Sequence, residues 1–230
     1  MSTRTHRKTL VPLAIVLASG AVALPHARAA EIATPLMAKT PISLKAGAPP
    51  LENKLWGSTY LGNPLRLLVL KDQTVGDTRW LKLRLPERPN SSFAWVREDR
   101  VRLSSTPAKI VIDISQRTVT LFWSGEEKWS ERVVVGAPAT PTPTGRFAIY
   151  ERYRTGSDLR PWVFETTAHS EKLKSYNGGP GRVAMHGRHG ALAAAMWGTA
   201  ASHGCIRMPD KALHRIAKQA PIGAPLRIKR

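Results

Sequence analysis

The chain contains a single cysteine, Cys205, within the segment Ser202-His203-Gly204-Cys205-Ile206-Arg207-Met208. A second histidine, His186, lies nineteen residues upstream in Met185-His186-Gly187. A lone thiol with histidines nearby in the sequence is a candidate nucleophile, because an imidazole can accept its proton. These residues predict an acyl-transfer enzyme that depends on a cysteine.

The neighbours of Cys205 could serve the same reaction. A free cysteine has a pKa near ~8.5, so a working nucleophile needs a base or a positive neighbourhood. His186 is the best candidate base, and it can meet Cys205 only if two adjacent strand ends bring them together. His203 would share a face with Cys205 in a strand, or lie beside the oxyanion in a bend. The amides of Gly204 and Cys205 could donate to that oxyanion, and Arg207 could hold a carboxylate or brace the loop.

Two other interpretations of the cysteine remain open. A free cysteine is often a small buried hydrophobic residue. The second alternative is a metal site, but the candidate ligands lack the short paired spacing of zinc sites; these ligands would be His186, His189, His203 and Cys205. A metal bound to the thiol would also silence the nucleophile. We therefore expect neither a metal nor a cofactor, and we expect surface positions for three further histidines, His169, His189 and His214.

The start of the chain has the three-part order of a secretory signal peptide. Residues 4–8 contain three cations, residues 10–24 form an uncharged apolar run, and an Ala-x-Ala pattern ends at Ala29. We expect cleavage near Ala29 or Ala30 and export to the periplasm or cell wall. An uncleaved anchor is the alternative, but a bilayer span needs about 20 apolar residues and this run is shorter. No later segment is apolar enough to span a membrane, so none is expected in the mature chain.

The charge of the chain indicates anionic partners. It has 35 Lys and Arg against 16 Asp and Glu, a formal net charge of +19, and it stays strongly basic without the expected leader. Nucleic acid, membrane lipid and anionic cell-wall polymers all fit such a surface. Export disfavours nucleic acid, and anionic wall polymers are then possible partners. Because oxidising compartments favour paired cysteines, one unpaired thiol there suggests use in chemistry.

We divide the chain into a signal peptide, a linker, a small barrel and a catalytic domain, at residues 1–30, 31–50, 51–104 and 105–230. Alternation and turn residues predict short strands in the barrel at 65–70, 80–85 and 94–96. The Trp, Leu-Pro and Ala-Trp-Val pattern there resembles bacterial SH3-like domains, which in secreted wall proteins often bind peptidoglycan. Trp80 and Trp95 are expected to pack in or beside the core, and a ligand groove is the alternative.

The last 126 residues predict a β-rich domain with one clear helix. Prolines make 136–147 an irregular loop, and 152–181 has the length of a flap over a site. Residues 191–196 are expected to form a connecting loop. The periodic segments predict strands at 109–114, 117–123, 131–136, 146–151, 162–164, 182–186 and 226–228, and a helix at 209–220.

Three separated motifs resemble the L,D-transpeptidase catalytic domain (YkuD type). They are the segment that contains Cys205, the Met185-His186-Gly187 segment and Pro141-Thr142-Pro143-Thr144-Gly145-Arg146-Phe147. The run from Asp113 to Gly136 also fits, and the similarity spans about residues 108–229. The fold implied for the whole chain is mainly β, with a small SH3-like barrel followed by a β-rich sandwich with a few short helices.

The resemblance implies a secreted enzyme that remodels peptidoglycan. By position, Cys205 would be the nucleophile and His186 the general base, while Ser202, His203, Gly204, Arg207 and Gly187 would shape the site around the acyl group and its oxyanion. Cys205 would attack the carbonyl that joins the third stem residue, a diamino acid, to D-alanine. The amine of a second stem would then resolve the thioester. Carbapenems are the implied inhibitor class.

Two alternatives keep the same motifs. Water as acceptor would make the enzyme an L,D-carboxypeptidase, and a protein with this fold but no turnover would be a wall-binding protein. One departure from the family pattern is Arg188-His189-Gly190, where relatives more often carry a small hydroxyl residue. Arg188 could tune the choice of acceptor.

Overall fold

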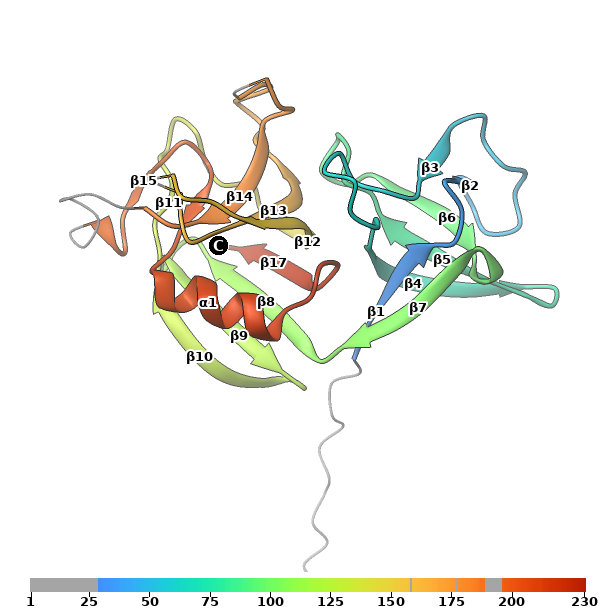
Figure 1. Ribbon diagram of the computed structural model, residues 1–230, viewed down its shortest axis with the longest axis horizontal. Helices are drawn as coiled ribbons and strands as arrows, with labels where there is room; N and C mark the ends of the chain where they lie inside the picture. Colours follow the sequence, from blue (N-terminus) through green and yellow to red (C-terminus); the bar gives the residue numbers. More distant parts are fainter. Residues whose placement is uncertain (1–28, 158, 177, 189–195) are drawn as a thin grey trace, which may run out of the picture.

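The computed structural model describes residues 29–157, 159–176, 178–188 and 196–230. The expected leader up to residue 28, most of the 191–196 loop, and His189 lie outside these ranges. The described chain forms two β-rich domains that lie side by side and are joined where β7 runs into β8 (Figure 1). No helix in these ranges has both the length and the apolar character needed to cross a membrane.

The N-terminal domain is built on a five-stranded sheet with the order β6-β5-β4-β1-β7. Its strands are β1 (Ala30–Pro35), β4 (Leu67–Val75), β5 (Thr78–Arg84), β6 (Phe93–Arg97) and β7 (Val101–Thr106), with a 3-10 turn at Glu98–Arg100. A separate pair, β2 (Lys39–Pro41) and β3 (Lys54–Trp56), packs beside it. Leu81 and Leu83 alternate into the core, as the pattern predicts. The resemblance to SH3-like domains stays a prediction.

The expected linker at 31–50 is wrong for its first part. Strand β1 lies inside the sheet between β4 and β7, and its register with β7 runs from Ala30 opposite Thr106 to Pro35 opposite Val101. Ile32 and Ala33 are both buried. Because these two consecutive residues are both buried, apolar and polar residues do not alternate along the strand, and the sequence shows no period-two pattern there. Trp95 is buried, so its expected packing role is confirmed.

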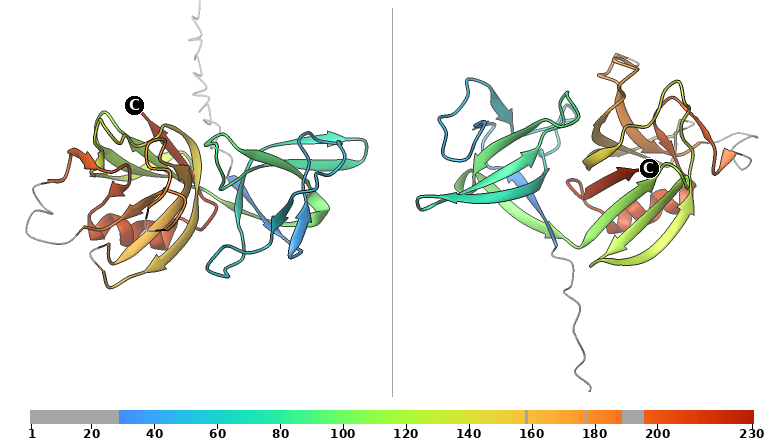
Figure 2. Two further views of the ribbon diagram at one scale, coloured as in Figure 1. Left: turned by 90° about the horizontal axis from the view of Figure 1, so that it is seen from above. Right: turned by 180° about the vertical axis from the view of Figure 1, so that it is seen from behind.

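The C-terminal domain contains an eight-stranded sheet with the order β10-β9-β8-β17-β12-β13-β14-β16. The sheet curls around a core to which both of its halves contribute (Figures 1 and 2). Its strands are β8 (Ala108–Asp113), β9 (Thr118–Trp123), β10 (Glu126–Arg132), β12 (Gly145–Arg154), β13 (Trp162–His169), β14 (Arg182–His186), β16 (Ile206–Arg207) and β17 (Pro225–Lys229). Two short strands, β11 (Val135–Gly136) and β15 (Ala200–Ser202), pair in parallel beside it.

The helix α1 (Asp210–Gln219) follows Pro209 and buries Ala212, Leu213 and Ile216 against this core. It confirms the predicted helix within one residue at each end. The predicted strand at 131–136 is instead the end of β10, which pairs with β9, and the separate strand β11, which pairs with β15. The turn before β10 takes only Ser124 and Gly125, both with positive φ. Strand β10 therefore starts at Glu126, earlier than the sequence indicated.

His169 is not a surface residue, in contrast to the expectation. It is 2% exposed, and its Nδ1 has no hydrogen-bond partner among the described residues. Strand β13 continues to His169, and Asn90 of the N-terminal domain covers it: its side-chain amide bonds the His169 carbonyl at 2.9 Å and its oxygen accepts from the His169 amide at 2.8 Å. His214, on α1, is exposed as expected.

This burial predicts acid sensitivity of the fold. Burial, and then Arg182 and Arg88, lower the pKa of His169 to about 4. In the unfolded chain His169 binds a proton near pH ~6.5. Protonation between that pH and 4 therefore favours the unfolded chain, so the free energy of unfolding is highest above pH ~6.5 and falls as the pH falls towards 4. We expect the thermal midpoint to fall across this window and His169→Leu to flatten the slope. Thermal unfolding at several pH values checks this, with the exposed His214→Leu as control; equal slopes in wild type and His169→Leu contradict it.

Candidate active site

Strands β14 and β16 bring the two main candidates together. They run in parallel, with Met185 opposite Ile206 and His186 opposite Arg207. Cys205 directly precedes β16, so the register places it beside Ala184. Because alternate residues of a strand share a face, His186 lies on the same side of the sheet as Cys205, one diagonal step away. His186 and Cys205 thus lie at the ends of two adjacent strands, the arrangement expected from the sequence as the condition for their contact.

The imidazole of His186 is held in one tautomer. It is buried, and its Nδ1 lies 2.6 Å from the Gly187 carbonyl oxygen. A carbonyl can only accept, so the neutral ring carries its proton on Nδ1 and keeps a lone pair on Nε2. Burial lowers the pKa of His186 to about 4, and Arg207 and Arg188 add to the effect, although the bond to Gly187 opposes it. The ring is therefore a neutral acceptor at neutral pH.

The thiol of Cys205 is free and partly buried. Burial raises its pKa, a backbone hydrogen bond from Ala184 and the charge of Arg207 lower it, and Glu165 raises it. The net direction is upwards, so the resting group is a thiol and not a thiolate. A nucleophile in this environment needs a base to take its proton.

Ser202 closes the turn that presents Cys205. Its Oγ accepts from the Gly204 amide at 3.1 Å and donates to the Cys205 carbonyl at 2.5 Å. Gly204 has φ +112°, a conformation that favours glycine. The Gly204 amide is thus already bonded, in contrast to the expectation that it donates to an oxyanion. His203 is exposed, while Ser202 is buried beside it.

The proline-rich loop at 136–147 is hydrogen-bonded to this turn and holds it in place. Thr142 Oγ1 donates to the Gly204 carbonyl at 2.9 Å and accepts from the Gly136 amide at 2.8 Å. Thr140 Oγ1 donates to the Ser202 carbonyl at 3.1 Å, and the Ala137 amide bonds the same oxygen at 2.8 Å. Sequence reasoning matched this loop to the family but gave Thr142 no role.

Thr142→Val tests that brace. Valine keeps the shape and removes the hydroxyl, which leaves a buried amide and a buried carbonyl without partners. Each such group costs about 1–3 kcal/mol, so we expect the free energy of unfolding to fall by about 2–6 kcal/mol. We also expect slower alkylation of Cys205. Urea unfolding and iodoacetamide kinetics measure the two effects. Thr120→Val, which removes an exposed Thr120–Ser130 contact, is the control; equal losses in both variants contradict the brace.

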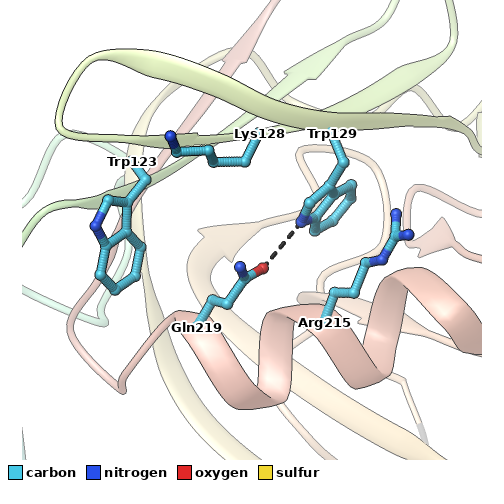
Figure 3. A pocket seen from close by; sticks show the side chains of 5 residues that line it. All are labelled: Trp123, Lys128, Trp129, Arg215 and Gln219. Carbon is cyan, nitrogen blue, oxygen red and sulfur yellow. Dashed lines mark hydrogen bonds between the residues drawn. The ribbon is translucent and has the colours of Figure 1, made fainter.

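A groove of about 500 Å³ lies away from the three motifs, between β10 and α1. Trp123, Lys128, Trp129, Arg215 and Gln219 line it, and Trp129 Nε1 donates to Gln219 Oε1 at 2.9 Å (Figure 3). Its strand residues, Trp123, Lys128 and Trp129, lie on β9 and β10, at the opposite end of the sheet order from β16. Within the described ranges, no three His, Cys, Asp or Glu side chains gather in a way that could hold a metal ion.

Comparison with known proteins identifies the family. The model of the L,D-transpeptidase catalytic domain (YkuD) matches residues 107–228. The Bacillus subtilis (strain 168) protein named "Putative L,D-transpeptidase YkuD" is 30% identical over 126 residues, which cover 54% of this chain and 67% of that protein. The chain therefore belongs to the L,D-transpeptidase catalytic-domain family, a family of acyltransferase enzymes.

Solved structures are similar at lower identity. An L,D-transpeptidase from Mycobacterium smegmatis is 14% identical with a TM-score of 0.43, over 71% of this chain and 99% of that one. One from Mycobacterium tuberculosis H37Rv is 17% identical with a TM-score of 0.44, over 66% and 90%. The family match begins at residue 107 and leaves the N-terminal domain outside it.

Proposed function

We propose that this protein is a peptidoglycan L,D-transpeptidase whose nucleophile is Cys205 and whose general base is His186. The observation that carries the proposal is the pairing of β14 with β16, which sets the unprotonated Nε2 of His186 on the face of Cys205. The family match supports the reaction class. The donor is a stem peptide in which a diamino acid at the third position is joined to D-alanine.

The reaction follows from these two groups. His186 Nε2 takes the thiol proton, and the thiolate attacks the carbonyl carbon of the third residue. The carbonyl oxygen becomes an oxyanion, for which the Cys205 amide is the candidate donor because Ser202 occupies the Gly204 amide. The bond to D-alanine breaks, and its nitrogen takes the proton from the imidazolium. A thioester remains on Cys205.

The second half returns the enzyme to its starting state. An acceptor amine loses a proton to His186 and attacks the thioester carbon, and the proton passes to the sulfur as the carbon–sulfur bond breaks. Arg207 lies beside His186 in the strand register, where it can hold a carboxylate of the peptide. If water replaces the amine, the product is a tripeptide and the enzyme is an L,D-carboxypeptidase.

We also propose that the protein acts after export, in the periplasm or at the cell wall. The signal-like order of residues 1–30 supports this, and the strongly basic charge that remains without these residues supports attraction to anionic wall polymers. Cell fractionation with mass analysis of the mature N-terminus tests it. A protein that keeps residues 1–28 and stays in the cytoplasm would contradict export.

Mass spectrometry with a purified disaccharide-tetrapeptide tests the reaction, beside a Cys205→Ala control. We expect a thioester adduct on the wild type with loss of D-alanine, and none on Cys205→Ala. A dimeric product identifies the transpeptidase, and a tripeptide identifies the carboxypeptidase. If folded, reduced wild type gives neither adduct nor product, the enzyme proposal fails for this donor. Pelleting with purified sacculi then tests the wall-binding alternative.

A further inference from the structure

A loop of the N-terminal domain reaches the sheet face that carries Cys205. Tyr60 donates its hydroxyl to Glu165 Oε1 at 2.5 Å. Next to it in the same loop, Thr59 donates to Glu151 Oε2 at 2.5 Å and Asn63 donates to Glu151 Oε1 at 3.1 Å. Glu151 and Glu165 are direct partners on β12 and β13. One loop therefore fixes two carboxylates of the catalytic sheet.

Glu165 belongs to the same series of cross-strand neighbours as Cys205. It is opposite Ala184 in the pairing of β13 with β14, and the register of β14 with β16 puts Ala184 beside Cys205. Partners in neighbouring strands share a face, so the carboxylate and the thiol lie on the same side. Two strand spacings put the backbones of Glu165 and Cys205 about 10 Å apart. At that distance a charge still acts on a partly buried thiol, because screening there is weak.

Arg182 ties the same carboxylate to the strand that carries the base. Its Nε lies 3.3 Å from Glu165 Oε2, and its Nη1 donates to the Pro86 carbonyl of the N-terminal domain at 3.0 Å. The guanidinium also stacks on Tyr150 at 4.2 Å. Arg182 is two residues before Ala184 on β14, on the same face. The domain contact thus includes β13 and β14, which come next to β16 in the sheet order.

The Tyr60 hydroxyl stays protonated and can therefore donate a hydrogen bond at any working pH. Its pKa is raised by burial and by the adjacent Glu165, so it stays protonated through the working pH range. Tyr60 as a whole residue is 62% exposed, so a change from tyrosine to phenylalanine removes the hydroxyl without opening a cavity in the core. A hydroxyl hydrogen directed at a carboxylate offsets part of the negative field that the carboxylate exerts elsewhere.

We propose that Tyr60 is a positioning residue of the active site, which acts through Glu165 so that docking of the N-terminal domain tunes the reactivity of Cys205. The charged and titratable groups on the same face as the thiol include Arg207 beyond it on β16, His186 and Arg182 on β14, Glu165 on β13, and Glu151 and Tyr153 on β12. Of the two carboxylates on this face that are bonded to the other domain, Glu165 is one strand nearer to the thiol than Glu151, and it is the one that Tyr60 bonds. Its effect on turnover rests on the proposed function, while its effect on the thiol does not.

The test is the pH profile of alkylation by iodoacetamide in the full chain, where Cys205 is the only cysteine. Glu165→Gln removes a negative charge, so we expect the midpoint to fall by about half a pH unit. Tyr60→Phe leaves the charge and removes the dipole that offsets it, so we expect a smaller rise, about 0.2 pH unit. In the double variant the effect of Tyr60→Phe should vanish.

Thr59→Val is the matched control, because it loosens the same loop but acts on Glu151. We expect its midpoint to equal that of wild type. A Tyr60→Phe profile that matches wild type, or a Thr59→Val shift as large as the Tyr60→Phe shift, would overturn the proposal. Alkylation needs no peptide donor. A protein that does not turn over the tetrapeptide but shows these shifts therefore refutes the proposed function and keeps this inference.

Discussion

Replacing His186 with glutamine is expected to lower kcat/KM for acyl transfer by about 10²–10⁴-fold. Glutamine can keep a hydrogen bond to the Gly187 carbonyl, which His186 Nδ1 now makes at 2.6 Å, but it cannot take a proton from the thiol. The loss should fall on the acylation step, measured as the rate of D-alanine release from a disaccharide-tetrapeptide. The exposed His214→Gln, on α1, is the control and should match wild type.

The pH dependence gives this expectation a second readout. Because burial lowers the pKa of His186 to about 4, the base is present from neutral pH down to that value. The acid limb of kcat/KM in wild type should therefore fall near pH 4 and not near ~6.5, the value of an exposed histidine. His186→Gln should lack this limb. Full activity in His186→Gln, or an unchanged acid limb, would rule out His186 as the base.

A second large effect is expected from Gly187→Ala. A Cβ at this position would overlap the Arg160 carbonyl oxygen and come within 3.3 Å of the Leu159 carbonyl oxygen. The backbone must move, and the carbonyl that fixes the His186 tautomer moves with it. We expect a loss of about 1–3 kcal/mol in the free energy of unfolding. A displaced base should also lower kcat/KM by about 10²-fold.

Thermal unfolding and D-alanine release measure both effects. Gly156→Ala is the matched control, because a Cβ there meets no atom within 4 Å. It should match wild type in stability and activity. If Gly187→Ala is destabilised yet fully active, the Gly187 carbonyl does not orient the base.

Much of the catalytic domain was predictable from apolar alternation. Ile110 and Ile112 on β8, and Val119 and Leu121 on β9, are all buried as their period indicates. The order of the strands was not predictable, because periodicity gives the face of a strand and not its partner. Strand β1 was not predicted, because its residues show no alternation of apolar and polar side chains. Its hydrogen bonds to β4 and β7 identify it as a strand.

The candidate site divides in the same way. Residue type and spacing predicted that Cys205 and His186 would meet at adjacent strand ends. The bond from the Gly204 amide to Ser202 and the brace by Thr142 depend on a turn geometry that spacing does not reveal. The sequence did not indicate a role for Glu165, because a single glutamate in a strand is usually a solvent-exposed residue. Its position emerges only when β13 is placed beside β14.

The place of β17 in the sheet has a consequence for how the domain forms. It pairs with β8 in parallel, with Leu226 opposite Ile110, and its other edge pairs with β12. Contacts between such distant residues favour slow folding, because a long loop must close before they form. Until β17 arrives, the apolar edges of β8 and β12 remain open and can pair with other chains. We therefore expect partly folded chains in which β17 is not yet paired to be the ones that aggregate.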